Sequence, residues 1–221
     1  MSTESLTLNG EDIKAVPVVR NLGIYMDNRL NLESHIANVQ KACYYYLNWI
    51  KKIRKYLSKD VTKSIVHALV VPRIDYCNSI YVNLPQCATD RLQRIRRSAS
   101  RLIARPERNA SVTEICRQLH WLPIPQRAEF KVLTLVYKAM HGEAPTYISD
   151  MLLQYQPKRS LRSTNSNQLC IRKTRVRYGK RAFSICGPEL WNQLPLDIRD
   201  SPSFSMFKRK LKTYLFRKAY C

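Results

Sequence analysis

The sequence predicts a mainly α-helical protein in which one or more helical bundles follow a small N-terminal β-hairpin. Two observations support this fold class. From residue 31 onward, apolar residues recur at steps of three and four over most of the chain, the period of a helix with one buried face. Before residue 30, the chain alternates around Asn9-Gly10 instead. Three parts are expected: a β-hairpin region (1–30), a helical domain (31–110) and a basic helical domain (111–221).

The N-terminal segment SLTLNGEDIKAV alternates on both sides of Asn9-Gly10, a dipeptide that favours a two-residue hairpin turn. A further strand is expected from Val16 to Met26, ending at the turn signal Asp27-Asn28. Residues 1–30 should therefore form a small antiparallel sheet. Two or three strands without a helix to pack on are only marginally stable.

A long helix should begin after Asn31, which is expected to be its N-cap. Its apolar seam recurs at steps of four and three and consists of Leu32, Ile36, Val39, Cys43, Tyr46, Ile50, Ile53 and Leu57. A coiled coil has the same spacing, but this seam lasts fewer than four heptads, so packing within a bundle is favoured. Its other faces carry Lys41, Lys51, Lys52, Arg54 and Lys55. Ser58 should cap a second helix that Pro72 ends or kinks.

The third helix, from about Ala88 to Ala104, has the clearest charge pattern. Its apolar stripe is Leu92, Ile95, Ala99 and Leu102, and four arginines fall on another face: Arg94, Arg97, Arg101 and Arg105. A guanidinium donates two parallel hydrogen bonds to phosphate oxygens, so this face suits a phosphate backbone. A merely solvated face is the alternative. Like charges four residues apart destabilise a helix unless they are neutralised, which favours phosphate contact.

The block from 111 to 150 is electrically neutral and should be the structural core of the C-terminal half. Ser111 and Glu114 have the spacing of a capping box. A helix should start near Pro125 and end at Gly142, and Pro145 suits the start of another short helix. The apolar face of the longer helix is Phe130, Leu133, Tyr137 and Met140, and Trp121 is expected to fill a corner between helices. The last helix should span Ser203 to Ala219, with Phe204, Phe207, Leu211 and Leu215 facing inward.

Residues 156–168 read as an exposed loop because they are polar and rich in turn formers. The basic segment that follows partly alternates, so a minor β element is expected near 169–178. Its cations are Arg172, Lys173, Arg175, Arg177, Lys180 and Arg181. With Tyr178 among them, this segment suits single-stranded nucleic acid, since cations contact phosphates and a ring stacks on a base.

The net charge of +22 indicates a polyanionic partner, and the backbone of RNA or DNA is the expected one. The basic residues are concentrated in two blocks, with a net +10 over 31–110 and +13 over 151–221. No secretory signal or membrane-spanning run is recognised, and the seven cysteines are scattered. We therefore expect reduced thiols, no membrane partner, and an intracellular protein, either nuclear or cytoplasmic.

No constellation for catalysis or for a cofactor is recognised. Nucleotide-binding glycine loops and zinc-protease helices are missing, and the only adjacent carboxylates, Glu11-Asp12, lie in the hairpin turn. Cys116 and His120 are four apart, as two metal ligands on one helix would be, but a buried pair is favoured because no second pair has ligand spacing. Asp150 and Tyr155 match a polymerase metal motif only weakly. No catalytic residue, metal or cofactor is expected.

Several segments, in this order, resemble the C-terminal part of the reverse transcriptase of non-LTR (LINE-like) retrotransposons of the jockey and chicken-repeat type. They are VRNLGIYMDNRLNLESHI, KKIRKYL, VPRIDYCNS, DRLQRIRRSASRLI, LHWLPIPQRAEFKVLTLVYKAMHG, RSLRS, YGKRAF and LWNQLPLDIR. The resemblance covers about Ser5 to Tyr220. It implies that Arg20 to Asp27 form the primer-grip hairpin, with Asn21, Leu22 and Gly23 as its primer-grip residues. It also implies that residues 32 to about 104 are the thumb and that residues from about 111 are the C-terminal domain.

In that family an endonuclease, the fingers and a palm with a Tyr-x-Asp-Asp metal site come first, and this chain contains no Tyr-x-Asp-Asp. The preferred interpretation is a truncated reverse-transcriptase-like protein that binds an RNA or DNA template–primer without polymerase catalysis. One alternative is a piece of an active RNA-directed DNA polymerase whose catalytic part lies outside this chain. The other is a host-recruited helical module whose neutral block binds a protein.

Overall fold

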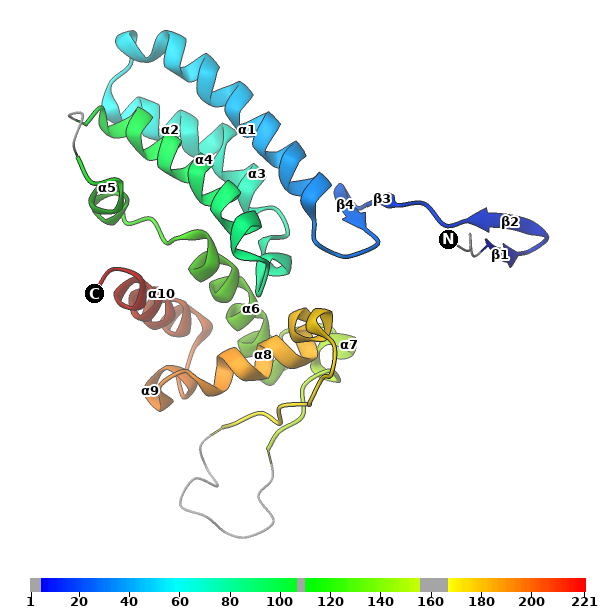
Figure 1. Ribbon diagram of the computed structural model, residues 1–221. Helices are drawn as coiled ribbons and strands as arrows, with labels where there is room; N and C mark the ends of the chain where they lie inside the picture. Colours follow the sequence, from blue (N-terminus) through cyan, green and yellow to red (C-terminus); the bar gives the residue numbers. More distant parts are fainter. Residues whose placement is uncertain (1–4, 107–109, 156–166) are drawn as a thin grey trace.

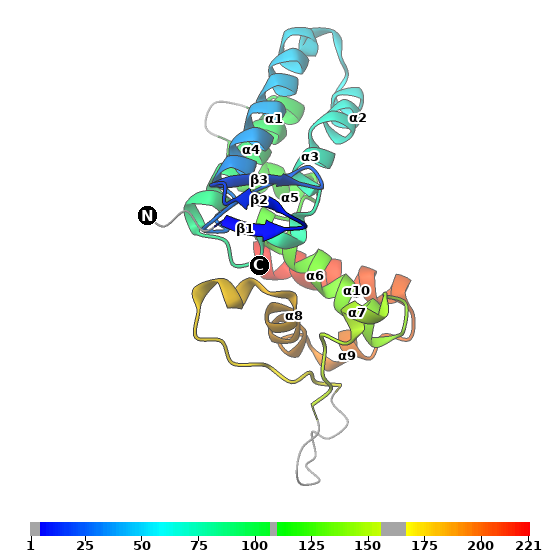
Figure 2. The ribbon, with the colours of Figure 1, turned by 90° about the vertical axis from the view of Figure 1, so that its right-hand side faces the viewer.

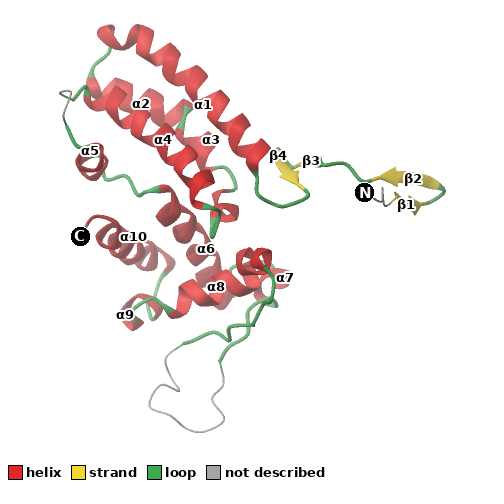
Figure 3. Ribbon diagram, in the orientation of Figure 1, coloured by secondary structure: helices red, strands yellow, loops and turns green. Residues whose placement is uncertain are grey.

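The computed structural model describes residues 5–106, 110–155 and 167–221, and it confirms the predicted class: mainly helical, with short N-terminal strands (Figures 1 and 3). With η denoting a 3-10 helix, the elements are β1 (Ser5–Leu8), β2 (Glu11–Lys14), β3 (Val18–Asn21), β4 (Ile24–Asp27), α1 (Glu33–Ile53), η1 (Arg54–Tyr56), α2 (Lys59–Leu69), α3 (Val71–Asp75), η2 (Asn78–Tyr81), α4 (Gln86–Ala104), α5 (Val112–Gln118), α6 (Ile124–Met140), α7 (Thr146–Ser149), η3 (Arg177–Arg181), α8 (Phe183–Asn192), α9 (Leu196–Arg199) and α10 (Phe204–Tyr220).

The N-terminal residues form two separate antiparallel hairpins. In the first, Leu8 pairs with Glu11 across Asn9-Gly10, and both turn residues have positive φ, so the predicted hairpin is confirmed. The expected single strand from Val16 to Met26 is wrong, because the chain reverses at Leu22-Gly23 and β3 pairs with β4. Leu22 and Gly23 have φ of 47° and 82°, and glycine adopts such a value without strain. Figure 1 shows β1 and β2 extending furthest from the helices.

The N-cap of helix α1 lies one residue later in the chain than expected. Leu32 is the N-cap residue, with a left-handed backbone and no side-chain cap bond, so the prediction of Asn31 is wrong. The Asp27 carboxylate instead accepts hydrogen bonds from the amides of Arg29 and Asn31 at 3.1 and 3.0 Å, which orders the turn before the helix. The buried seam also differs: Leu47 is buried where Tyr46 was expected, and Ile53 is exposed as the chain tightens into η1.

Helices α2 to α4 follow the predicted caps and breaks. The Ser58 hydroxyl accepts a hydrogen bond from the Val61 amide at 3.2 Å and caps α2, and α2 ends before Pro72, which lies in the first turn of α3. In α4 the expected apolar residues Leu92, Ile95 and Ala99 are buried, while Leu102 is half-buried and Ile103 takes the last core position.

The neutral block keeps its predicted helices but not its capping box. Ser111 is the N-cap residue of α5 but makes no side-chain cap bond, and the Glu114 carboxylate forms an ion pair with Arg117 at 2.9 Å instead of closing the box. Helix α6 has Pro125 in its first turn and ends before Gly142, which has a φ of 69°. The short helix expected at Pro145 is α7, with Pro145 as its N-cap residue, and the expected last helix is α10, where the Ser203 hydroxyl accepts a hydrogen bond from the Met206 amide.

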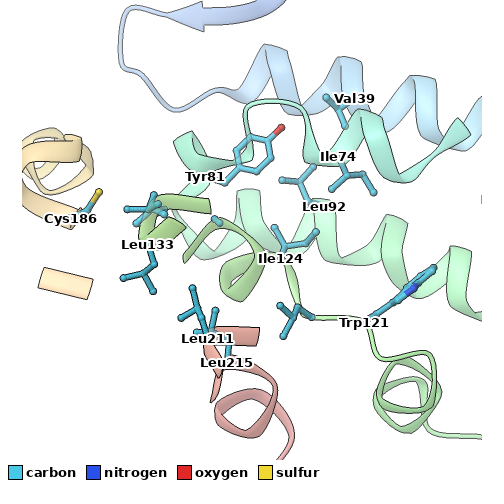
Figure 4. Close-up of a cluster of buried hydrophobic side chains, with 14 of the residues drawn as sticks. Val39, Ile74, Tyr81, Leu92, Trp121, Ile124, Leu133, Cys186, Leu211 and Leu215 are labelled. Carbon is cyan, nitrogen blue, oxygen red and sulfur yellow. The ribbon is translucent and has the colours of Figure 1, made fainter. Parts of the chain in front are cut away.

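The helices form two tiers, with α1–α4 above and α6–α10 below in Figures 1 and 2. One hydrophobic core joins the tiers, because buried residues of α1 and α4 and buried residues of α6 and α10 belong to the same cluster (Figure 4). Arg127 of α6 also pairs with Asp75 of α3, with its Nε 2.8 Å from Oδ1. Residues 31–110 and 111–221 therefore share a core. No helix in the described ranges is both long and apolar enough to cross a membrane.

Candidate nucleic-acid interface

The predicted arginines of α4 lie on its solvent side. Arg94, Arg97 and Arg101, which we call the arginine face, are exposed, and Arg105 is the exposed C-cap residue just beyond the helix, in a left-handed conformation. In the described part of the chain, none of the four has a carboxylate within ion-pair distance. Asp90 lies on the same side of α4, where its carboxylate accepts a hydrogen bond from Gln86 Nε2 at 2.9 Å. The arginine face therefore presents cations to solvent.

A different arginine holds the end of this helix. Arg54 of η1 is buried and donates hydrogen bonds to the carbonyls of Leu102, Ile103 and Leu57 at 2.8, 3.0 and 2.6 Å. A cation at the carbonyl end of a helix is favourable because that end carries partial negative charge. Burial, and then the charge of Arg105, lowers the pKa of Arg54. Arg54 thus fixes the C-terminal end of α4, beside the exposed arginines.

Arg96 points into the protein instead of toward solvent. It is buried, and its guanidinium lies 5.4 Å from the ring centroid of Trp121, the residue expected to fill a corner between helices. Trp121 is buried, and its Nε1 donates to His67 Nε2 at 3.2 Å, which joins α2, α4 and the segment before α6. Burial lowers the pKa of Arg96, opposed by the neighbouring Cys116 and Tyr220. Sequence reasoning placed no residue at this junction except Trp121.

The basic segment of 170–181 forms no strand. The minor β element expected near 169–178 is limited to one isolated bridge between Gln154 and Leu169, just before this segment, and the chain then continues without a strand into η3. Paired strands need a partner, and the segment runs instead along the surface before α8. The exposed residues of the segment include Arg172, Lys173, Arg175, Tyr178 and Lys180, and Arg177 opens η3. Of the expected exposed loop 156–168, residues 156–166 lie outside the described residues.

Arg181, the last cation of this segment, is half-buried and bonded within the protein. Its guanidinium donates to the carbonyl of Leu30 and, at 3.4 Å, to the carbonyl of Ile80. Burial lowers the pKa of Arg181, and nearby Asp27 opposes the shift. Arg181 therefore joins the basic segment to the residues just before α1 and to η2, and its guanidinium has a structural role instead of the predicted contact with nucleic acid.

The turn Asn21-Leu22-Gly23 lies beside the upper tier, where the Tyr76 hydroxyl donates to the Leu22 carbonyl at 2.7 Å. An open cleft of about 540 Å³ is lined by residues of this hairpin on one side and of α1 to α3 on the other. Basic, aromatic and amide side chains line much of it: Arg20, Tyr25, His35, Asn38, Arg73 and Tyr76. Arg73 contacts Tyr46 in two ways, donating to its hydroxyl at 3.0 Å and lying 4.6 Å from its ring centroid. The cleft could not be seen in the sequence because its walls come from distant segments.

The candidate metal pair does not form. Helix α5 ends at Gln118, so His120 lies outside it with a φ of 54°, exposed and 5.7 Å from the Phe216 ring, whereas Cys116 is buried. The prediction that both side chains lie on one helix is therefore wrong, and so is the favoured interpretation of a buried pair, since His120 is exposed. Among the described residues, no group of three or more His, Cys, Asp or Glu could hold a metal ion. Asp150 follows α7 as its C-cap residue.

Comparisons of this chain with protein-family models, with curated proteins and with solved structures find no match.

Proposed function

We propose that this chain is a reverse-transcriptase-like protein of the non-LTR retrotransposon type that binds the backbone of an RNA or DNA template–primer without polymerase catalysis. The observation that carries the proposal is the arginine face, which presents Arg94, Arg97 and Arg101 to solvent on one rigid helix. Contacts of this kind are made to phosphates and are independent of base sequence.

Electrostatics support a phosphate partner for this face. Arg97 and Arg101 are four residues apart on α4, a spacing at which like charges repel, and no described carboxylate pairs with either. A row of phosphates relieves that repulsion and accepts bidentate hydrogen bonds. Arg105 continues the row as the C-cap residue at the end of the helix, just after the carbonyls of Leu102 and Ile103 that Arg54 binds. The exposed cations of the basic segment, Arg172, Lys173, Arg175 and Lys180, add a second cationic surface to the proposal.

The hairpin β3–β4 supports the primer-grip part of the proposal. Its turn, Asn21 to Gly23, borders a cleft whose other wall is α1 and α2–α3, so the turn and the thumb-like helices face one shared space. In the proposed template–primer complex this turn would contact the primer strand. The proposal assigns no catalytic step to the chain, because the Tyr-x-Asp-Asp motif is missing from its residues.

A salt titration tests the proposal. Fluorescence anisotropy of a labelled DNA duplex and of a matched RNA–DNA hybrid is measured between roughly 50 and 200 mM salt. Binding that weakens steeply with salt, and equally for unrelated duplex sequences, is the expected result. Affinity that is absent at low salt, or independent of salt, would contradict the proposal and favour a protein-interaction module.

Primer extension tests the absence of catalysis separately. Purified protein with Mg²⁺, primer, template and nucleotides should extend nothing. Template-dependent incorporation that co-purifies with the chain, and that persists after contaminating polymerases are removed, would show that the non-catalytic assignment is wrong.

A further inference from the structure

The outward side of α1 carries a row of aromatic rings. Tyr45 and Trp49 of α1 and Tyr56 of η1 are 58%, 55% and 76% exposed. Tyr45 and Trp49 are four residues apart, so at 100° per residue they lie within about 40° of each other, and Tyr56 follows in the turn that continues α1. We call these three residues the aromatic strip. The buried residues of α1 lie on the opposite side, and Figure 1 shows α1 along the outer edge of the upper tier. Single exposed apolar residues are ordinary, but three exposed rings within twelve residues of α1 and η1 indicate a binding surface.

Lysines flank this strip along the chain. Residues 34–59 contain no Asp or Glu, and their exposed lysines are Lys41, Lys51, Lys52, Lys55 and Lys59. Two of them lie against the rings: Lys52 Nζ is 5.4 Å from the Trp49 centroid, and Lys55 Nζ is 4.7 Å from the Tyr56 centroid. The Tyr45 and Trp49 centroids are 6.3 Å apart. Trp49 and Tyr56 therefore each have a positive charge within reach of an anionic group on a flat ligand that stacks there.

We propose that the aromatic strip is a stacking site for unpaired nucleobases of a single-stranded nucleic acid, with the flanking lysines on its phosphates. This inference deepens the proposed function and rests on it. Aromatic platforms beside cations are how proteins bind single strands without sequence preference, because every base has a π-face. A duplex hides its base faces in its own stack, so the strip selects unpaired strands while the arginine face binds either form.

The tryptophans of this protein provide a direct readout. Trp121 and Trp191 are only 5% and 1% exposed, so Trp49 is the tryptophan that an added ligand can contact. The probes are an oligothymidine of about 12 nucleotides, within the site size of single-strand binders, an abasic strand of the same length, and the matching duplex. Oligothymidine should quench the Trp49 emission, and the abasic strand and the duplex should not.

Variants then measure the contribution of each ring by anisotropy of labelled oligothymidine. Trp49→Ala should weaken binding by about 5- to 100-fold, the loss expected for one stacked base, and should change duplex affinity by less than about twofold. Trp49→Phe keeps a stacking ring and should retain most of the affinity. Tyr147→Ala is the matched control, because Tyr147 on α7 is 64% exposed but lies outside the strip, and it should have no effect.

The outcomes separate this inference from the proposed function. If the abasic strand binds as tightly as oligothymidine and Trp49→Ala binds like the wild type, the strip makes no stacking contacts and the inference fails, while binding to phosphates stands. If no nucleic acid binds the wild type at low salt, both the proposed function and this inference fail. A Trp49 response to anionic vesicles, with none to oligothymidine, would also overturn the inference.

Discussion

Replacing Arg94, Arg97 and Arg101 together by alanine is the most informative perturbation of the proposed phosphate contacts. Each phosphate contact on a DNA duplex contributes about 0.9 to the slope of log affinity against log salt, so three contacts contribute about 2.7. Over a fourfold rise in salt, that part of the slope corresponds to a loss of affinity of about 40-fold. The wild type should therefore weaken about 40-fold more than the triple variant when salt rises from about 50 to 200 mM.

The triple variant should fold normally, which keeps the binding result interpretable. The three side chains are exposed and make no ion pair with any described residue, so each replacement should change the free energy of unfolding by less than about 0.5 kcal/mol. Leu92 lies on the buried side of the same helix and is fully buried, so Leu92→Ala should cost about 2–5 kcal/mol. Urea unfolding of both variants measures this contrast.

Arg117→Ala is the matched binding control. Arg117 is also an exposed helical arginine, but its charge is paired with Glu114 at 2.9 Å. Removing it should leave both duplex affinity and the salt slope unchanged. Anisotropy with several unrelated duplexes is the assay. A folded triple variant with the affinity and salt slope of the wild type would refute the reasoning and leave the arginine face as ordinary solvated surface.

Three further predictions concern pH, stability and thiol reactivity. Burial lowers the pKa of His67, and the charges of Lys63 and Arg127 lower it further. His67 accepts the hydrogen bond from Trp121 Nε1 only when it is neutral, so the stability that this bond contributes should be complete above about pH 6.5 and be lost as the pH falls below that value. In urea unfolding at several pH values, His67→Gln should flatten this dependence. Arg54→Ala removes three hydrogen bonds to carbonyls and should lower the free energy of unfolding by about 2–4 kcal/mol. The control Lys51→Ala replaces an exposed side chain and should change that free energy by less than about 0.5 kcal/mol, and equal effects of the two variants would contradict the role of Arg54 at the end of α4. Burial raises the thiol pKa of Cys43 and Cys186 to about 11. Mass spectrometry should therefore find that iodoacetamide alkylates the exposed Cys77, Cys87 and Cys221 in the folded protein, and Cys43 and Cys186 only after denaturation. Labelling of either buried thiol in the folded protein would contradict this packing.

The sequence by itself determined the features that depend on neighbours along the chain. Asn9-Gly10 forms its turn because both residues tolerate positive φ, and Ser58 and Ser203 cap their helices because a hydroxyl reaches an amide three residues on. The exposure of the arginine face also followed from sequence, since the apolar stripe of α4 sets which side of that helix is buried. The seam of α1 was less certain: Tyr46 and Leu47 are adjacent, and the neighbouring helices decide which of them is buried.

The tertiary structure alone decided what depends on residues far apart in the chain. Arg181 belongs to a run of cations that look alike in sequence, yet it is bonded to the carbonyls of Leu30 and Ile80. Arg96 and Arg97 are neighbours in the sequence and share the same flanking residues, but Arg96 is buried with its guanidinium against the Trp121 ring, whereas Arg97 is exposed. The aromatic strip was not anticipated either, because a ring in a helix is exposed or buried according to what packs on that side. The spacing of apolar residues predicts the buried face of a helix, but the residues beside that face are covered or exposed according to the elements that pack there.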